Sequence, residues 1–148
     1  MTGAEPVFID TNVLVAATVE AHPSHAVALA LLAKLAGDDV AACVSPQVCR
    51  EYLSVLTRGP VAGRQFTNEE ALDALTRSLE GCAVLDETAA VLNELLMLVA
   101  RRGVRGKQVH DANVVATMIA NRVTRLATLD ASDFSRYEDV ITLEPVTS

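Results

Sequence analysis

The chain has 148 residues, a length that is typical of one compact domain and short for two. Hydrophobic residues make up 51% of it and charged residues 21%, a balance that excludes a chain disordered along its whole length. The formal net charge of −7 argues against a protein whose whole surface binds nucleic acid, but it is compatible with a carboxylate site whose charge a bound metal offsets.

Short apolar runs alternate with longer stretches of helical character along the chain. Strands are predicted at Val7–Ile9, Ala41–Val44, Ala83–Leu85, Arg125–Leu129 and Val140–Leu143. Helices are predicted at Val13–Val19, Ser24–Ala36, Pro46–Thr57, Asn68–Leu79, Glu87–Arg102 and His110–Arg122. This alternation indicates an α/β fold with a parallel sheet covered by helices on both faces. No repeat or linker interrupts it, so residues 1–148 are expected to form a single domain.

Several helix ends carry clear signals. Ser45 precedes a proline and is predicted to cap the helix that begins there. Thr67 and Glu70 have the spacing of a capping box. Asp86 is expected to cap the helix from residue 87, and Gly103 to end it.

The cysteines and the apolar stretches point to a cytoplasmic protein that does not associate with membranes. Cys43, Cys49 and Cys82 are odd in number and form no Cys-x-x-Cys pair, so reduced thiols are expected. The first six residues lack the basic start of a signal peptide. The longest apolar stretch, Ala26–Leu35, is too short to span a bilayer.

Four acidic residues follow or flank the predicted buried elements. Asp10 closes the first strand, and Asp130 closes the strand Arg125–Leu129. Glu51 and Asp111 lie in the first half of helices that begin at the same edge of the sheet. Because sites in open parallel sheets form at the carboxyl ends of the strands, these four side chains are predicted to converge.

Converging carboxylates require a cation. Two such charges about 4 Å apart repel each other by about 4 kcal/mol at an effective dielectric constant near 20. The ligands are all hard oxygens with no accompanying histidine or cysteine, so Mg²⁺ or Mn²⁺ fits best. An ion held in this way favours metal-assisted hydrolysis of a phosphodiester.

Each acidic residue also has an ordinary structural interpretation. Asp10 suits a turn or a helix cap, and Glu51 an exposed helix surface. Asp111 suits the first turn of a helix, while Asp130 and Asp133 both suit turns. One shared site is favoured because four independent coincidences on one edge are less probable.

Other polar residues near these positions are candidates for supporting roles. Asn12 and Thr128 either hydrogen-bond the ligand carboxylates or make local turn bonds. His110 lies about 100° around its helix from Asp111, which argues against a catalytic base. His22 is expected to be a surface or capping residue, as is His25. Arg101, Arg102, Arg105 and Lys107 form the one dense basic cluster, which either binds a nucleic-acid backbone or complements the negative end of a helix dipole.

The chain resembles the PIN-domain ribonucleases, and most of all their compact bacterial branch, the VapC-type toxins of type II toxin–antitoxin systems. The resemblance spans nearly the whole chain and rests on segments that occur in the family's order. These are Asp10-Thr11-Asn12-Val13-Leu14, Arg50-Glu51-Tyr52-Leu53, His110-Asp111-Ala112 and Thr128-Leu129-Asp130-Ala131-Ser132-Asp133-Phe134.

This resemblance implies a three-layer α/β/α sandwich around a parallel sheet and Mg²⁺- or Mn²⁺-dependent endoribonuclease activity. It assigns the acidic quartet to Asp10, Glu51, Asp111 and Asp130, and the polar supports to Asn12 and Thr128. Asp133 is the substitute for Asp130, which is favoured because it follows its predicted strand directly. The implied partners are an RNA substrate, a second copy of the chain in a homodimer, and an antitoxin that places a basic side chain in the acidic site.

Two other functions compete with the toxin ribonuclease. An aspartate-nucleophile phosphatase or phosphotransfer domain would use Asp10, but it would need a second acidic residue where Asn12 stands or a paired acidic residue before Asp10. A noncatalytic α/β interaction module would use the acidic edge only to bind a basic partner, and it would tolerate the loss of a single carboxylate.

Overall fold

The computed structural model describes residues 4–147. Five strands form one parallel sheet in the order β3-β2-β1-β4-β5. The strands are β1 (Val7–Ile9), β2 (Ala42–Val44), β3 (Cys82–Val84), β4 (Arg125–Ala127) and β5 (Thr142–Glu144). All residues of the central strand β1 are buried, which explains its unbroken apolar sequence.

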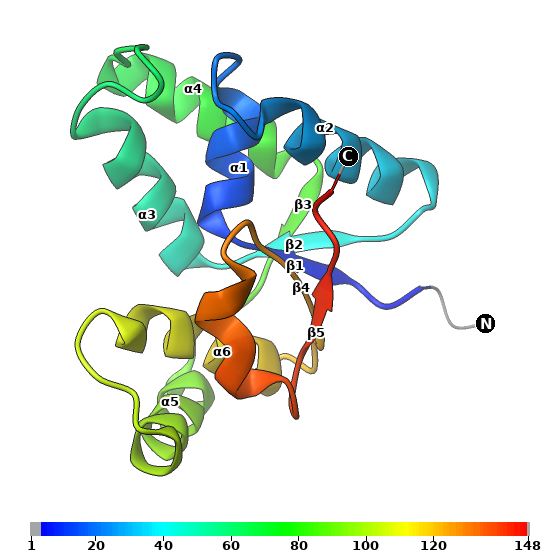
Figure 1. Cartoon of the computed structure of the whole chain (residues 1–148), viewed down its shortest axis with the longest axis vertical. Helices are drawn as coiled ribbons and strands as arrows, with labels where there is room; N and C mark the ends of the chain where they lie inside the picture. Colours follow the sequence, from blue (N-terminus) through cyan, green and yellow to red (C-terminus); the bar gives the residue numbers. More distant parts are fainter. Residues whose placement is uncertain (1–3, 148) are drawn as a thin grey trace.

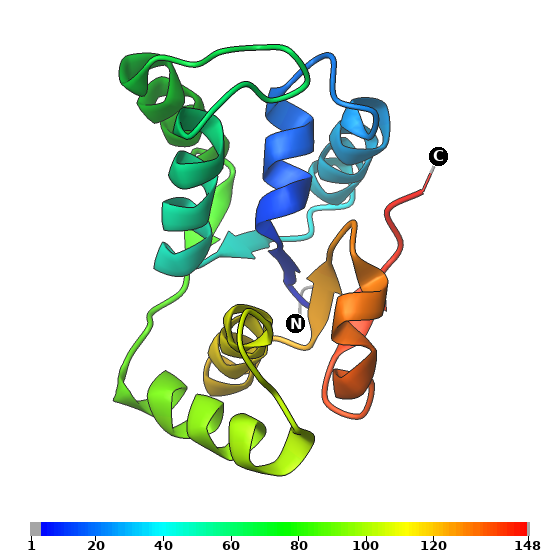
Figure 2. The same ribbon diagram turned by 60° about the vertical axis from the view of Figure 1, so that its left-hand side comes forward.

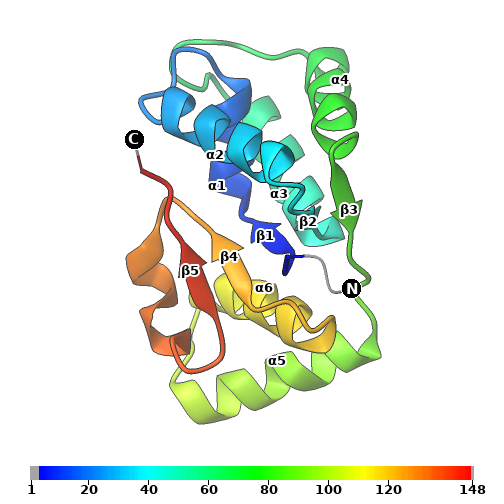
Figure 3. The ribbon, with the colours of Figure 1, turned by 90° about the vertical axis from the view of Figure 1, so that its right-hand side faces the viewer.

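The helices cover both faces of the sheet. They are α1 (Thr11–Thr18), α2 (His25–Gly37), α3 (Pro46–Thr57), α4 (Asn68–Leu79), α5 (Ala89–Arg102) and α6 (Gln108–Ala120), followed by the 3₁₀ helix η1 (Ala131–Tyr137). Helices α1 to α4 lie on one face, and α5 and α6 lie on the other (Figures 1 and 3). The predicted three-layer α/β/α sandwich is therefore confirmed.

The carboxyl ends of β1, β2 and β4 lead directly into the part of the molecule that carries the acidic residues. Helix α1 rises from β1, and α3 begins close to the end of β2 (Figure 2). Helix α6 packs on α5 and contacts η1, which follows β4. The N-terminal ends of α1, α3 and α6 thus approach one edge of the sheet, as the alternation of strands and helices predicted.

Of the capping and stop signals predicted from the sequence, those of Ser45, Thr67, Glu70 and Gly103 are confirmed and that of Asp86 is wrong. The Ser45 hydroxyl accepts a hydrogen bond from the backbone N–H of Val48, and Gly103 ends α5 with a left-handed φ of 63°. Asp86 does not cap α5, because the helix begins two residues later than predicted and Thr88 caps it instead.

The capping box at the start of α4 gives a stability prediction. The Thr67 hydroxyl accepts from the N–H of Glu70 at 3.0 Å, and the Glu70 carboxylate accepts from the N–H of Thr67 at 3.0 Å. We expect Thr67→Ala to lower the free energy of unfolding by about 1 kcal/mol, measured by urea denaturation. Thr76→Ala is the control, because its hydroxyl only bonds the carbonyl of Leu72 within the same helix. Equal losses in both variants would contradict the capping role.

Among residues 4–147 no helix is long and apolar enough to cross a membrane.

Candidate active site

One pocket gathers the predicted acidic residues. It has a volume of about 530 Å³ and is lined by Asp10, Glu51, Asp111, Asp130 and Asp133 together with neighbouring polar and apolar side chains. These carboxylates come from the end of β1, the first half of α3, the first turn of α6 and the segment around η1. The structure therefore brings all four predicted residues, and the proposed substitute, to the same cavity.

Asp10 is the most buried of these carboxylates, with 7% of the residue exposed. It caps α1 by accepting a hydrogen bond from the N–H of Thr11, and it accepts a second bond from the Thr128 hydroxyl, both at 2.8 Å. Burial raises the pKa of Asp10 to about 6, and the negative charges of Asp111 and Glu51 add to the rise although both hydrogen bonds oppose it. Ionisation of Asp10 without a nearby cation therefore costs free energy in the folded protein.

Asp111 is in a similar electrostatic position. Burial and, to a smaller extent, the charges of Asp133, Glu51 and Asp130 together raise its pKa to about 6. These couplings show that carboxylates from four separate segments act on one another across the pocket. Two aspartates with raised pKa values in one cavity make this pocket a candidate functional site.

Glu51 is held by a hydrogen-bond network that the sequence analysis did not identify. It accepts from the Thr11 hydroxyl at 3.0 Å and from the Gln47 side-chain amide at 2.8 Å. The same Gln47 amide donates to the carbonyl of His110 at 2.8 Å, and its oxygen accepts from the Asn113 amide at 2.7 Å. Gln47 thus joins α3 to the start of α6. Its position four residues before Glu51 on one helix was the available signal.

Asn12 and Thr128 make the carboxylate hydrogen bonds that were predicted as one of two alternatives. The register that pairs Ile9 with Ala127 places Asp10 beside Thr128 at the edge of the sheet. The Asn12 amide donates to Asp130 at 3.1 Å and to the Thr128 hydroxyl at 3.3 Å. These bonds link the acidic residue after β1 to the one after β4.

The reason given for preferring Asp130 over Asp133 is wrong. The strand β4 ends at Ala127, so Asp130 lies three residues beyond it, at the N-cap position of η1, and does not follow the strand directly. Both aspartates line the pocket, and the charge of Asp133 acts on Asp111 more strongly than that of Asp130 does. Which of them would bind a metal stays a prediction to be tested.

The carboxylates form a looser group than predicted. Within residues 4–147, no three or more His, Cys, Asp or Glu side chains are arranged closely enough to hold a metal ion between them. The donor chemistry nevertheless fits a hard divalent ion, because the pocket presents carboxylate and amide oxygens and two aspartates with raised pKa values. Mg²⁺ commonly keeps several waters and uses only one or two protein carboxylates, so the looser arrangement suits it.

The basic cluster lies outside the pocket. Arg102 forms an ion pair with Asp139, in which Nη2 donates to Oδ2 at 2.9 Å. Its Nη1 also donates to the carbonyl of Arg136 at 2.7 Å. It therefore fastens α5 to η1. Arg101, Arg105 and Lys107 are exposed and have no ion pair with a carboxylate in the described part of the chain.

Two of the histidines line the same pocket. His110 lies beside Asp111 at the start of α6, and His22 reaches the pocket from the segment between α1 and α2. His22 is half-buried and lines the pocket, a position that its prediction as a surface or capping residue did not include. It does also cap locally, since its Nδ1 accepts a hydrogen bond from the N–H of Ser24 at 3.0 Å.

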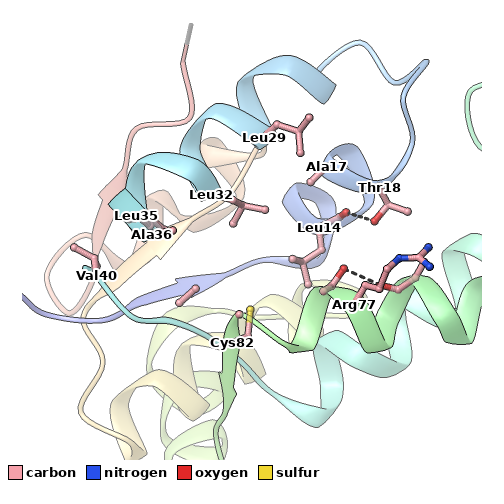
Figure 4. A pocket seen from close by; sticks show the side chains of 14 residues that line it. Leu14, Ala17, Thr18, Leu29, Leu32, Leu35, Ala36, Val40, Arg77 and Cys82 are labelled. Carbon is pink, nitrogen blue, oxygen red and sulfur yellow. Dashed lines mark hydrogen bonds between the residues drawn. The ribbon is translucent and has the colours of Figure 1, made fainter. Parts of the chain in front are cut away.

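A second hollow, with a volume of about 430 Å³, lies between α1, α2 and α4. Leu14, Leu29, Leu32 and Leu35 dominate its walls, and Arg77 supplies the charged side chain drawn at its edge (Figure 4). None of the described residues that line it carries a carboxylate, in contrast to the acidic pocket.

Comparison with known proteins agrees with this geometry. A family model described as "PIN domain" matches residues 7–140. The chain is 31% identical over 143 residues to Ribonuclease VapC24 of Mycobacterium tuberculosis, covering 95% of this chain and 97% of that protein.

Solved structures share the fold at lower identity. VapBC2 from Rickettsia felis, bound to a DNA fragment from its promoter, aligns with a TM-score of 0.65 and 19% identity, covering 93% of this chain and 96% of that one. VapC20 of Mycobacterium tuberculosis, a sarcin-ricin loop cleaving toxin, aligns with a TM-score of 0.65 and 18% identity, covering 92% and 96%. The family match and the relative of 31% identity together establish that this chain belongs to the PIN-domain family, in its VapC ribonuclease branch.

Proposed function

We propose that this protein is the ribonuclease toxin of a type II toxin–antitoxin system and that it hydrolyses RNA phosphodiester bonds in the acidic pocket. The observation that carries the proposal is the set of five carboxylates from four segments that line one cavity of a PIN-domain fold. A noncatalytic module does not account for the placement of Asp10 and Asp111 where ionisation is costly.

Divalent metals are generally used by PIN-domain ribonucleases, and we propose Mg²⁺ or Mn²⁺ for this chain. Asp10, Glu51, Asp111 and either Asp130 or Asp133 would hold the ion. When bound, it would lower the pKa of an attacking water and offset charge on the scissile phosphate.

The remaining residues fix the carboxylates in place. Thr128 and Asn12 hold Asp10 and Asp130 by the bonds described above, while Thr11 and Gln47 direct Glu51. Such bonds orient metal ligands and raise affinity for the ion. Arg101, Arg105 and Lys107 precede α6 and are proposed to contact the RNA backbone, whereas Arg102 is engaged with Asp139.

We further propose a cytoplasmic protein with two protein partners. The first is a cognate antitoxin that places a basic side chain among the carboxylates, which the −7 charge of the chain favours. The solved VapBC2 structure supports such a partner. The second is another copy of the chain in a homodimer. Leu92 and Leu96 on α5 are exposed, and a second copy of the chain could bury them in a dimer interface.

The proposal is tested by incubating the purified protein with total cellular RNA in Mg²⁺, in Mn²⁺ and in a chelator. We expect discrete cleavage products with either ion and none with the chelator. Cleavage that persists in the chelator would remove the metal from the mechanism. A phosphorylated Asp10 recovered from incubation with a phosphate ester would favour the phosphotransfer alternative.

The fourth acidic position is tested by comparing Asp130→Asn with Asp133→Asn. Loss of a carboxylate that holds the ion should lower cleavage by about 100-fold or more, whereas loss of a nearby charge should lower it by about tenfold or less. The measurement is the cleavage rate as a function of metal concentration. Equal and small effects would show that neither residue holds the ion.

A further inference from the structure

The acidic pocket has a second half that the metal chemistry does not use. Its walls include Val15, Val55 and Val61, and its basic side chains are Arg58 and His22. Val15 is buried, whereas Val55 and Val61 are partly exposed to the cavity. Apolar and cationic groups thus stand beside the carboxylates in one continuous hollow.

One face of α3 spans both halves. Glu51, Ser54, Val55 and Arg58 all line the pocket, at the spacings of three and four residues that share a helix face. The lining therefore changes along this face from acidic to apolar to basic. The seven-residue step from Glu51 to Arg58 corresponds to a rise of about 10 Å along the helix axis, so a phosphate held near the carboxylates is not the one that Arg58 can reach.

The two basic residues are available to an anion. Arg58 is exposed, and no carboxylate within residues 4–147 forms an ion pair with it. His22 accepts a hydrogen bond at Nδ1 from the N–H of Ser24, so in the neutral ring Nε2 carries the proton and acts as the donor. Arg58 is the C-cap residue of α3, and His22 lies in the segment between α1 and α2, so both come from the α1–α4 layer.

We propose that this half of the pocket is a nucleotide subsite, in which Arg58 and His22 bind the phosphate next to the scissile one and the valines contact its ribose and base. The inference rests on the proposed ribonuclease function, which it extends to how the substrate is held. A pocket with five carboxylates repels a polyanion, so local cations are needed to bring RNA to it. A basic antitoxin segment is a poorer occupant of this half, since Arg58 would repel it.

The test compares Arg58→Gln with Arg50→Gln. Arg50 is an exposed arginine of α3 that does not line the pocket, whereas Arg58 is the C-cap residue of that helix, so each variant removes one positive charge from α3 or its end. Binding of a short single-stranded RNA is measured on the Asp111→Asn background in Mg²⁺ at several salt concentrations. We expect Arg58→Gln to weaken binding by about tenfold and to reduce the slope of log affinity against log salt by about 0.7, the value for one lost phosphate contact. Arg50→Gln should change neither by a comparable amount.

Steady-state cleavage provides the second measurement. Arg58→Gln in the otherwise unaltered protein should raise KM with little change in kcat, Arg58→Lys should restore much of the loss, and His22→Ala should add a further severalfold loss of affinity. Equal behaviour of Arg58→Gln and Arg50→Gln, with cleavage by the parent intact, would overturn the subsite. Absence of metal-dependent cleavage by the parent would instead overturn the proposed function. A urea midpoint for Arg58→Gln close to that of the parent excludes a folding defect.

Discussion

Replacing Asp10 with asparagine should abolish RNA cleavage and at the same time stabilise the metal-free protein above pH 6. The loss of cleavage follows from the central place of Asp10 among the carboxylates that line the pocket. A metal contributes several kcal/mol of charge stabilisation to phosphodiester hydrolysis, and each 1.36 kcal/mol is a factor of ten in rate. A fall of at least about 1,000-fold in the cleavage rate is therefore expected.

The gain in stability follows from the raised pKa of Asp10. Because the folded protein binds this proton more tightly than the unfolded chain, the associated stability is complete below the ordinary value of 3.8 and is lost as the pH rises through about 6. The loss amounts to about 3 kcal/mol. Asparagine removes this cost, but it has only one acceptor oxygen, whereas Asp10 accepts from both the Thr11 N–H and the Thr128 hydroxyl. Its NH2 group must therefore face either the Thr11 N–H or the Thr128 oxygen, which already accepts from Asn12 and from the N–H of Asp130. That conflict costs about 1 kcal/mol.

The net expectation for Asp10→Asn in a chelator is a stability advantage of about 1–2 kcal/mol at about pH 8 that disappears at about pH 4.5. Urea denaturation at both pH values measures it. Asp73→Asn, an exposed residue of α4 outside the pocket, should show neither the advantage nor the loss of cleavage. Added Mg²⁺ should stabilise the parent and not Asp10→Asn, because only the parent retains the full ligand set. A variant that is less stable than the parent at both pH values would refute the electrostatic interpretation.

The sheet and its helices were predictable because the apolar runs of the strands and the capping signals of the helices indicate the same fold. The run from Val7 to Ile9 is apolar throughout, as a strand buried on both faces must be. The helices Pro46–Thr57 and Asn68–Leu79 have the predicted bounds, since each carries a proline or a capping box at its start. The predicted strand Arg125–Leu129 was too long, because β4 ends at Ala127 and the Thr128 hydroxyl bonds Asp10. Threonine is common in strands, so its presence did not indicate that the strand would end before it.

The convergence of the acidic residues was predictable from chain order alone, whereas their supports were not. The positions of Asp10 and Asp111 could be predicted because parallel strands end, and the helices that follow them begin, at one edge of a sheet. Gln47 and Asn113 are paired across 66 residues, and no local pattern predicts which two amides will meet. His22 was missed for the same reason, since its approach to the pocket depends on how the segment after α1 folds back.

The strongest test of these unpredicted supports is Gln47→Met, a change of similar shape that removes both polar atoms. Only 4% of Gln47 is exposed, and its amide satisfies Glu51, the His110 carbonyl and Asn113 at once. Removing it leaves several partly buried groups without their partner, each at a cost of about 1 kcal/mol or more. We expect the free energy of unfolding to fall by about 3 kcal/mol and cleavage to fall by about 10- to 100-fold.

The cause of the lost activity can be separated from the lost stability. If Gln47 acts by directing Glu51 toward the ion, the Mg²⁺ concentration for half-maximal cleavage should rise in Gln47→Met at a temperature where the variant is fully folded. Gln65→Met, at an exposed position in the loop before α4, should leave both the stability and the metal requirement unchanged. If Gln47→Met loses stability but keeps the parent's Mg²⁺ requirement, the role of Gln47 is only to link α3 to α6. Glu51 would then be oriented by Thr11 alone.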